Sequence, residues 1–355
     1  MSGSLTAPYW DADRDGVLVC REIRDETADT RTFILSAPEP RLFDYRPGQF
    51  MTFDIALNGG TVQRCYTLAS SPTRPHRVSI TVKRVPGGPA SNWLHDNLRV
   101  GGTLDALGPM GEFTLGDVGG RNLLLLSAGS GVTPLMSMAR AHHDLGGEQD
   151  VVFVHSARSP ADIVFADEVG LMARAGSRFR ATTVCEQADG GWNGFTGRLS
   201  LPMLTLIAPD FLEREIFVCG PTGYMDSVRA MLVEAGFDMR RHHQESFVFE
   251  DLSPLEQAQA EAGDGGAARS FQVEFTRSRR TLDVAESSFV LAAAKQAGMR
   301  LPSSCTQGMC GTCKSRLVSG TVAMTHAGGI RQREIDQGMI LLCCSRPTSD
   351  LVIER

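Results

Sequence analysis

The stretch Cys305-Thr306-Gln307-Gly308-Met309-Cys310-Gly311-Thr312-Cys313 sets three cysteines close together in the spacing C-x4-C-x2-C. A fourth cysteine, Cys343, follows after a further 29 residues. Three thiolates on one short loop and a fourth from elsewhere can close around a small metal centre. The two glycines of the stretch suit such a loop, because glycine adopts positive φ angles at little cost and lets backbone N–H groups turn toward sulfur.

The spacing C-x4-C-x2-C…C is typical of plant-type ferredoxins, whose four thiolates bind a [2Fe–2S] cluster. We therefore predict Cys305, Cys310, Cys313 and Cys343 as the cluster ligands. A zinc site would favour paired short spacings, and a disulfide framework is unusual in a chain of this size with nine cysteines and no secretory segment. Cys344 remains an alternative fourth ligand because it lies directly beside Cys343.

Composition limits the classes of protein that remain. A chain of 355 residues has room for two or three domains. The net charge of −6 and the sequence pI near 5.8 argue against a nucleic-acid-binding protein. No apolar run approaches the ~18 residues of a membrane span, and the first residues lack the pattern of a signal peptide. We expect a cytoplasmic protein with no nucleic-acid or membrane partner, since a reducing compartment suits free thiols and a cluster.

Residues 17 to 116 are predicted to form an antiparallel β-barrel, because short candidate strands alternate with glycine and proline. The expected strands cover residues 48–55, 62–68, 78–84 and 103–106, and an amphipathic helix is expected over 91–98.

Two motifs in this region favour a phosphorylated aromatic ligand. Arg64 and Tyr66 share one face of a strand, while Thr67 lies on the other, because side chains alternate with period 2. The guanidinium suits a phosphate, and the phenol ring suits stacking. The glycine-rich turn before Ser91 would offer backbone N–H groups to an anion at a helix start. A hairpin loop followed by an ordinary N-cap remains the alternative for this turn.

Together these motifs resemble the ferredoxin reductase-type flavin domain, which carries R-x-Y-[ST] against the flavin and a glycine–serine phosphate turn. The segment Arg46-Pro47-Gly48-Gln49-Phe50 also matches that family. Two phosphate-contacting elements favour FAD, and FMN stays open because phthalate dioxygenase-type reductases share part of the pattern. The resemblance implies a flavin site formed by Arg64, Tyr66, Thr67, Lys83, Gly88 and Ser91.

Residues 121 to 242 alternate strand and helix patterns, which predicts an α/β domain with a parallel sheet. The apolar run 122–127 reads as a buried strand and leads into Gly129-Ser130-Gly131-Val132-Thr133-Pro134. This turn resembles the G-x-G-[IV]-T-P turn of the same family's nicotinamide domain. The resemblance implies that Gly129, Gly131 and Thr133 contact the dinucleotide.

A second strand, 151–154, leads to Ser156 and Arg158 at the sheet edge where ligands of open α/β sheets bind. Arg158 either meets the adenosine ribose or is an ordinary surface arginine. The family favours NADH, and NADPH stays open because a guanidinium near the ribose can grip a 2′-phosphate.

A third strand, 215–218, ends in Cys219-Gly220-Pro221, which matches the family's C-G-P motif near the nicotinamide and the flavin. An inert buried cysteine is the alternative. Glu245-Ser246-Phe247 corresponds to the family's E-x-[FYW] segment beside the isoalloxazine. By this resemblance Cys219, Tyr66 and Glu245 are the candidate catalytic residues, and Gly220, Pro221 and Phe247 contact the cofactors.

The sequence thus predicts a multidomain chain. Its parts are an FAD-binding β-barrel over 14–118, an α/β nicotinamide domain over 119–247, a flexible linker over 248–268 and an α+β, β-grasp ferredoxin domain over 269–355. In the last domain a hairpin within 271–284 and a helix over 289–297, stopped by Gly298, precede the cluster loop.

Nearly the whole chain is similar to the family of reductase subunits of glycine betaine monooxygenases, which are Rieske-type demethylase systems. The resemblance implies that electrons pass from NADH through FAD and one [2Fe–2S] cluster to a separate Rieske-type oxygenase. The alternatives are a reductase of another Rieske demethylase or of a hybrid-cluster protein, and a non-catalytic electron carrier or redox sensor. The segments that carry the similarity are 81–88, 91–98, 155–160, 208–215 and 343–345.

Overall fold

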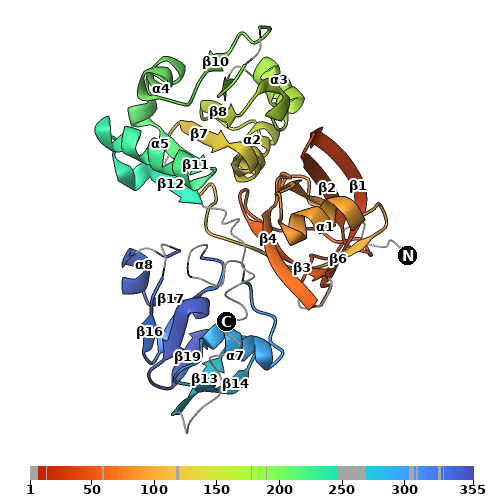
Figure 1. Ribbon diagram of the computed structural model, residues 1–355, viewed down its shortest axis with the longest axis vertical. Coiled ribbons are helices and arrows are strands. Elements are labelled where there is room, and N and C mark those ends of the chain that lie inside the picture. The colour runs from red at the N-terminus through yellow and green to blue at the C-terminus, as the bar shows by residue number, and fades with distance from the viewer. Residues whose placement is uncertain are drawn as a thin grey trace. The chain divides into compact units, whose positions relative to one another are not determined.

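The computed structural model describes residues 7–12, 14–57, 60–116, 120–176, 178–188, 190–245, 269–303, 308, 311–326, 329–330 and 332–355. The chain divides into two compact units, Met1–Phe247 and Val248–Arg355 (Figure 1). Phe247, Cys305 and Cys310 lie outside the described residues, as does the predicted linker 248–268. Within the described residues, no helix is long and apolar enough to cross a membrane.

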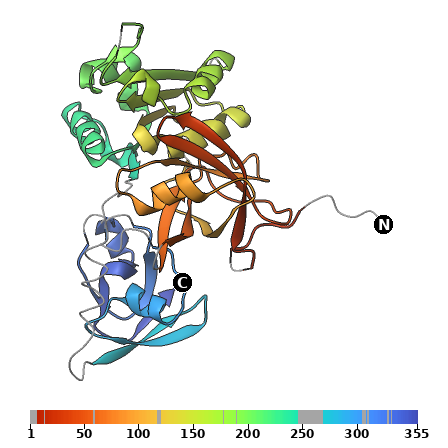
Figure 2. The same ribbon diagram turned by 45° about the vertical axis from the view of Figure 1, so that its right-hand side comes forward.

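A six-stranded antiparallel sheet forms the first part of the larger unit, with strand order β4-β3-β6-β1-β2-β5. Leu68 bridges Ile80 across the two sheet edges, and the Ala69 N–H donates to the Ser79 carbonyl, so the sheet closes into the predicted barrel. Helix α1 (Pro89–Asn97), orange in Figure 2, packs against it. The strands are β1 (Val17–Thr27), β2 (Thr30–Ser36), β3 (Phe50–Leu57), β4 (Gly60–Thr67), β5 (Val78–Lys83) and β6 (Thr103–Met110).

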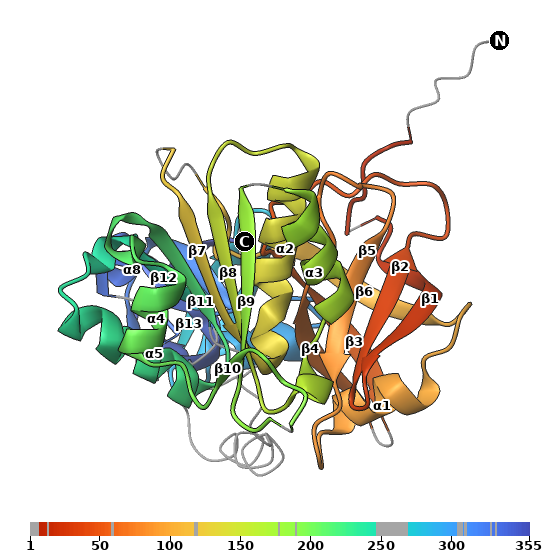
Figure 3. The ribbon, with the colours of Figure 1, turned by 90° about the horizontal axis from the view of Figure 1, so that it is seen from above.

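A parallel sheet forms the second part of the same unit, in the order β10-β9-β8-β7-β11-β12. Helices α2 (Val132–Asp144) and α3 (Ala166–Ala175) cover one face, and α4 (Leu201–Ile207) and α5 (Thr222–Glu234) cover the other (Figure 3). The strands are β7 (Leu123–Ala128), β8 (Val151–Ala157), β9 (Phe179–Cys185), β10 (Phe195–Thr196), β11 (Glu215–Cys219) and β12 (His242–Glu245). Short 3-10 turns are η1 (Gly129–Gly131), η2 (Pro160–Asp162), η3 (Phe211–Glu213) and η4 (Met239–Arg241).

The barrel is fastened to the parallel sheet directly after β4. Ser137 on α2 donates a hydrogen bond to the Ser70 carbonyl at 2.7 Å, and Arg140 on α2 donates to the Ala69 carbonyl at 2.5 Å. Ala69 also belongs to the same hydrophobic core as Cys219 at the end of β11. The ends of β4 and β11, which carry candidate flavin and nicotinamide residues, are therefore held in one packed region.

The smaller unit has a mixed sheet in the order β14-β13-β19-β15-β17, with helix α7 (Val290–Gln296) packed against it (Figure 1). The helix begins after Phe289 and ends before Gly298, which has a φ of +76°. This α+β arrangement confirms the predicted β-grasp class. Its elements are β13 (Ser270–Phe275), β14 (Arg280–Ala285), β15 (Lys314–Ser319), β16 (Val322–Met324), α8 (Gln332–Asp336), β17 (Met339–Leu341), η5 (Leu342–Cys344), β18 (Ser345–Pro347) and β19 (Leu351–Glu354).

The Arg140 contact yields a stability prediction. Arg140→Met leaves the buried Ala69 carbonyl without its donor and removes the bidentate pair with Glu168, so we expect a loss of about 1–3 kcal/mol in unfolding free energy. Arg240→Met is the control, because Arg240 makes a comparable pair with Asp238 on the surface and should change stability little. Urea unfolding, monitored by the release of bound flavin, measures the unfolding free energy of both variants. Equal stability of the two variants would contradict the role of Arg140.

Candidate redox site

Strand β4 carries three candidate flavin residues, Arg64, Tyr66 and Thr67. Thr67 is 3% exposed, and its hydroxyl has no hydrogen-bond partner among the described residues. Tyr66 packs beside Phe53 with ring centroids 6.1 Å apart, and the Arg64 guanidinium donates to the Gln63 carbonyl at 2.8 Å. Buried hydroxyls are almost always hydrogen-bonded, so the unpaired Thr67 Oγ1 fits a bound polar ring.

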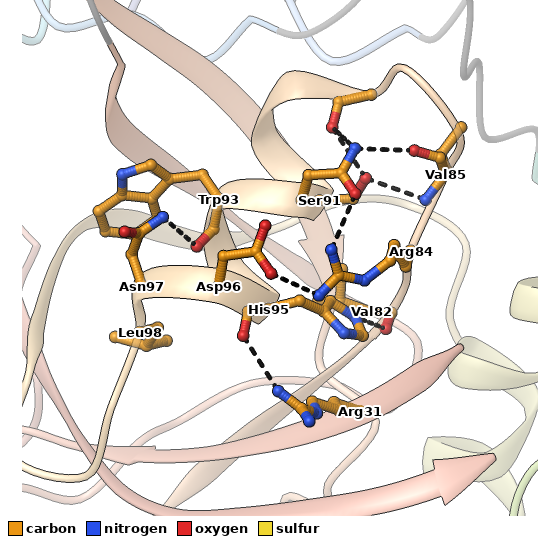
Figure 4. Close-up of polar contacts among 12 residues, drawn as sticks. Arg31, Val82, Arg84, Val85, Ser91, Trp93, His95, Asp96, Asn97 and Leu98 are labelled. Atoms are coloured by element: carbon orange, nitrogen blue, oxygen red, sulfur yellow. Dashed lines mark hydrogen bonds and ion pairs between the residues drawn. The ribbon is translucent and has the colours of Figure 1, made fainter. Parts of the chain in front are cut away.

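The glycine-rich turn before Ser91, which the sequence predicts to contact a phosphate, is held by hydrogen bonds of the residues on either side of it (Figure 4). Ser91 Oγ accepts a hydrogen bond from the Val85 N–H at 3.1 Å and donates to the Gly88 carbonyl at 3.2 Å. A Cβ on Gly88 would lie 2.9 Å from Ser91 Oγ and 3.0 Å from Val85 Cβ, so a larger residue would displace these side chains. Ser91 therefore holds the turn in shape, and its contact with a phosphate stays a prediction.

The glycine turn after β7 lies directly against the end of β11. A Cβ on Gly131 would overlap the Cys219 carbonyl, so this position requires glycine, and the φ of +52° at Gly129 favours glycine there. Thr133 is buried, and its hydroxyl donates to the Ser130 carbonyl at 3.1 Å, which closes the turn. This close approach leaves the backbone of the turn free of side chains, which suits a dinucleotide diphosphate at the start of α2.

Cys219 and Glu245 are register partners at the ends of the parallel strands β11 and β12. Burial raises the pKa of Glu245 to about 8, and its Oε2 has no hydrogen-bond partner among the described residues. Burial, together with the nearby Glu245, also raises the pKa of the Cys219 thiol well above its ordinary value. Both groups are therefore neutral at pH 7, so Cys219 is not an activated thiolate.

Three further polar groups lie at this sheet edge. The Tyr224 and Ser156 hydroxyls are both buried and interact with one another, and the Tyr224 ring lies against Gly220, whose added Cβ would be 3.0 Å from Tyr224 Cδ1. His155 Nδ1 lies 2.9 Å from Ser127 Oγ, and burial lowers the pKa of His155 to about 4. Ser156 was predicted from sequence, whereas Tyr224 and His155 were missed. The signal for Tyr224 was its place three residues after Pro221, in the first turn of α5.

Lys83 and Arg158, the other two basic residues predicted to bind a cofactor, both form ion pairs. Lys83 Nζ lies 3.1 Å from Asp29 Oδ2, and Arg158 Nη2 lies 3.3 Å from the same oxygen. Pro221 is the residue directly before α5 and turns the chain from β11 into that helix.

In the smaller unit, Cys313 and Cys343 are both buried near the loop glycines. The Gly308 N–H donates to Cys343 Sγ at 3.2 Å, and the Cys343 N–H donates to Cys313 Sγ at 3.4 Å. Gly308 and Gly311 have φ angles of +73° and +75°, as the sequence predicted. Backbone N–H donors to two neighbouring sulfurs suit the thiolate ligands of a [2Fe–2S] cluster.

The neighbouring Cys344 differs in its contacts. Its Sγ lies 3.7 Å from the Leu341 carbonyl, whereas Cys343 Sγ accepts the Gly308 N–H, and Cys343 as the fourth ligand stays a prediction. The described residues include no group of three or more metal-ligating side chains, and two of the four predicted ligands, Cys305 and Cys310, lie outside them.

Comparison with known families and proteins agrees with this architecture. The chain matches an oxidoreductase FAD-binding domain over residues 18–115, an oxidoreductase NAD-binding domain over 125–230 and a 2Fe-2S iron-sulfur cluster binding domain over 273–348. It is 46% identical to the glycine betaine monooxygenase reductase subunit of Pseudomonas aeruginosa, over 99% of this chain and 98% of that protein. The chain belongs to this family of oxygenase reductases.

Two other proteins are similar to this chain over almost its full length. The stachydrine N-demethylase reductase subunit of Rhizobium meliloti is 39% identical over 95% of this chain and 96% of its own length. The solved structure of phthalate dioxygenase reductase covers 97% of this chain and 98% of its own, with a TM-score of 0.60 and 25% identity. This oxygenase reductase is therefore an oxidoreductase with FAD, nicotinamide and one [2Fe–2S] cluster as cofactors, and its electron acceptor is a separate oxygenase.

The neutral Glu245 yields a prediction about pH. The raised pKa means that its stabilising, protonated state is fully present below the ordinary value of 4.5 and is lost as the pH rises through about 8. Glu245→Gln mimics the protonated form, so the native chain should lose thermal stability relative to this variant between pH 5 and pH 9.

The temperature of flavin release, measured across that pH range, tests this expectation. The exposed Glu234→Gln on α5 is the matched control and should follow the native profile. Parallel profiles of the native chain and Glu245→Gln would show that this carboxyl is not buried and neutral.

Proposed function

We propose that this chain is the NADH-dependent reductase of a Rieske-type glycine betaine monooxygenase. The observation that carries the proposal is the 46% identity to a glycine betaine monooxygenase reductase subunit over almost the full length of both proteins. One chain carries the FAD-binding, NAD-binding and cluster-binding parts that this electron transfer needs. The oxygenase, rather than this chain, would bind the methylated ammonium substrate, and we place both proteins in the cytoplasm.

The proposed roles follow from the geometry. When bound, FAD exchanges a hydride for single electrons, which a [2Fe–2S] cluster carries one at a time. Thr67, with its unpaired buried hydroxyl, would orient the flavin ring, and Tyr66 and Arg64 would hold the rest of that cofactor. Cys219 and protonated Glu245 would line the nicotinamide site with uncharged groups. These residues bind and orient, and no acid–base pair is required of them.

The proposed cluster would be held by Cys305, Cys310, Cys313 and Cys343. The N–H donors of Gly308 and Cys343 would stabilise the negative charge on the sulfurs and so tune the reduction potential.

Reconstitution tests the proposed partner. The purified chain, NADH and oxygen are combined with a glycine betaine monooxygenase oxygenase, and formaldehyde release from glycine betaine is measured. Stachydrine with its own oxygenase is the comparison, because the 39% identical relative serves that demethylase. Faster turnover with the glycine betaine system supports the proposal, and turnover with stachydrine alone would assign the chain to the second demethylase.

A variant that lacks one cluster ligand separates electron transfer to the flavin from electron transfer through the cluster. Cys313→Ser removes one predicted ligand, so we expect NADH-dependent ferricyanide reduction to persist. Oxygenase-coupled demethylation should fall at least about a hundredfold, because loss of a group that only supports a metal ligand already costs about 10–100-fold. Cys185→Ser is the control, because Cys185 is a buried cysteine of the parallel sheet, far along the chain from the cluster loop. Loss of both activities in Cys313→Ser, with the control unaffected, would show that the cluster is needed for folding.

A further inference from the structure

Asp29, in the turn between β1 and β2, brings a carboxylate of the barrel to the nicotinamide domain. Its Oδ2 lies 3.1 Å from Lys83 Nζ and 3.3 Å from Arg158 Nη2, and Arg158 is 129 residues away in sequence. Its Oδ1 accepts hydrogen bonds from the hydroxyls of Thr27 at 3.1 Å and Thr30 at 3.0 Å. Four side chains therefore fix this carboxylate in place.

The charge of Asp29 is retained at neutral pH. Burial by itself would raise the pKa of this carboxyl, but the hydrogen bonds from Lys83 and Thr30 outweigh burial and lower the pKa below its ordinary value. Asp29 is thus an anion placed between two cations.

Arg158 has a second acidic partner in its own domain. Its guanidinium lies 3.0 Å from Asp162 Oδ1 in η2, and the other oxygen of Asp162 accepts a hydrogen bond from Ser159 Oγ at 2.7 Å. Lys83, Arg158, Asp29 and Asp162 form what we call the Asp29 cluster, in which two positive and two negative charges cancel. Arg158 therefore has no uncompensated charge to offer an additional anion.

The position of Arg158 gives this pairing a consequence for cofactor choice. Arg158 directly follows β8, the second strand of the β7–α2–β8 unit. In dinucleotide-binding sheets this position reads the adenosine ribose, where an acidic residue accepts the 2′-hydroxyl of NAD and an arginine accommodates the 2′-phosphate of NADP. An unpaired Arg158 would therefore favour NADPH.

We propose that Asp29 is a specificity-determining residue, which excludes 2′-phosphorylated dinucleotides by holding Arg158 and Lys83 in ion pairs. The proposal rests on the NADH-dependent function proposed above and names the residue that sets its cofactor preference. A 2′-phosphate would meet two carboxylates and would have to break existing ion pairs, whereas a 2′-hydroxyl carries no charge and leaves them intact. Selectivity of this kind comes from a repulsive element rather than from an added contact.

The test uses the flavin-loaded chain and Asp29→Asn, which keeps the shape of the side chain and removes its charge. Isothermal titration measures the affinity for adenosine 2′,5′-bisphosphate and for ADP, and steady-state kinetics gives kcat/KM for NADPH and NADH. We expect the affinity for the 2′,5′-bisphosphate and the NADPH-to-NADH ratio of kcat/KM to rise about tenfold, the value of one charge-assisted hydrogen bond. The affinity for ADP should change little.

Three further variants isolate the effect. Asp25→Asn is the matched control, because Asp25 lies on the same hairpin and pairs with Arg31 at 2.6 Å instead. The double variant Asp29→Asn/Arg158→Ala should return the 2′,5′-bisphosphate affinity to the native value. Asp162→Asn removes the other partner of Arg158 and should act in the same direction, which keeps the test valid if Asp29→Asn folds poorly.

Two results would overturn the inference. One is an unchanged preference in both Asp29→Asn and Asp162→Asn. The other is an equal gain in ADP affinity in these variants, which would place the effect at the diphosphate. In either case a native chain that still oxidises NADH leaves the proposed function intact. A native chain that neither binds ADP nor oxidises NADH would refute the proposed function and this inference together.

Discussion

The redox site depends on the attachment of the segment after β4 to helix α2. Ser137 and Arg140 on that helix bind the carbonyls of Ser70 and Ala69, and Ala69 shares a hydrophobic core with Cys219. This attachment, together with ion pairs such as Asp29–Arg158 and Arg74–Asp144, holds the barrel that carries Thr67 against the part of the chain that carries Cys219. With it, the flavin side and the nicotinamide side of the site form one packed region, and electron transfer from NADH needs that juxtaposition.

The electrostatics of the site follow a simple division. The groups inside it are neutral at pH 7, because burial raises the pKa of Cys219 and Glu245 and lowers that of His155. Charges are retained at the margin, where the Asp29 cluster is partly exposed and internally balanced. A neutral interior suits the transfer of hydride and electrons between stacked rings, whereas the margin controls which dinucleotide enters.

The sequence predicted the parts of this chain that depend on local pattern. Cysteine spacing indicated the cluster, alternation and turn residues indicated the barrel, and the glycine turn and C-G-P motif located the ends of β7 and β11. Contacts between distant segments carried no such signal. The pairing of Asp29 with Arg158 joins a barrel turn to a parallel-sheet loop, and the Ser91 hydroxyl faces its own turn. Both depend on tertiary distances, and the burial of the Tyr224 hydroxyl beside Ser156 is visible only once its surroundings are known.

The central claim is that electrons from NADH reach the flavin first, then the cluster, and then an oxygenase. Anaerobic rapid mixing of the fully loaded chain with NADH tests it most directly, with flavin absorbance and the EPR signal of the reduced cluster followed in the same samples. The account predicts that flavin absorbance falls first, that the cluster signal rises afterwards, and that oxidised oxygenase then removes the cluster signal. A cluster signal that rises before any loss of flavin absorbance, or a flavin that NADH does not bleach, would contradict the account.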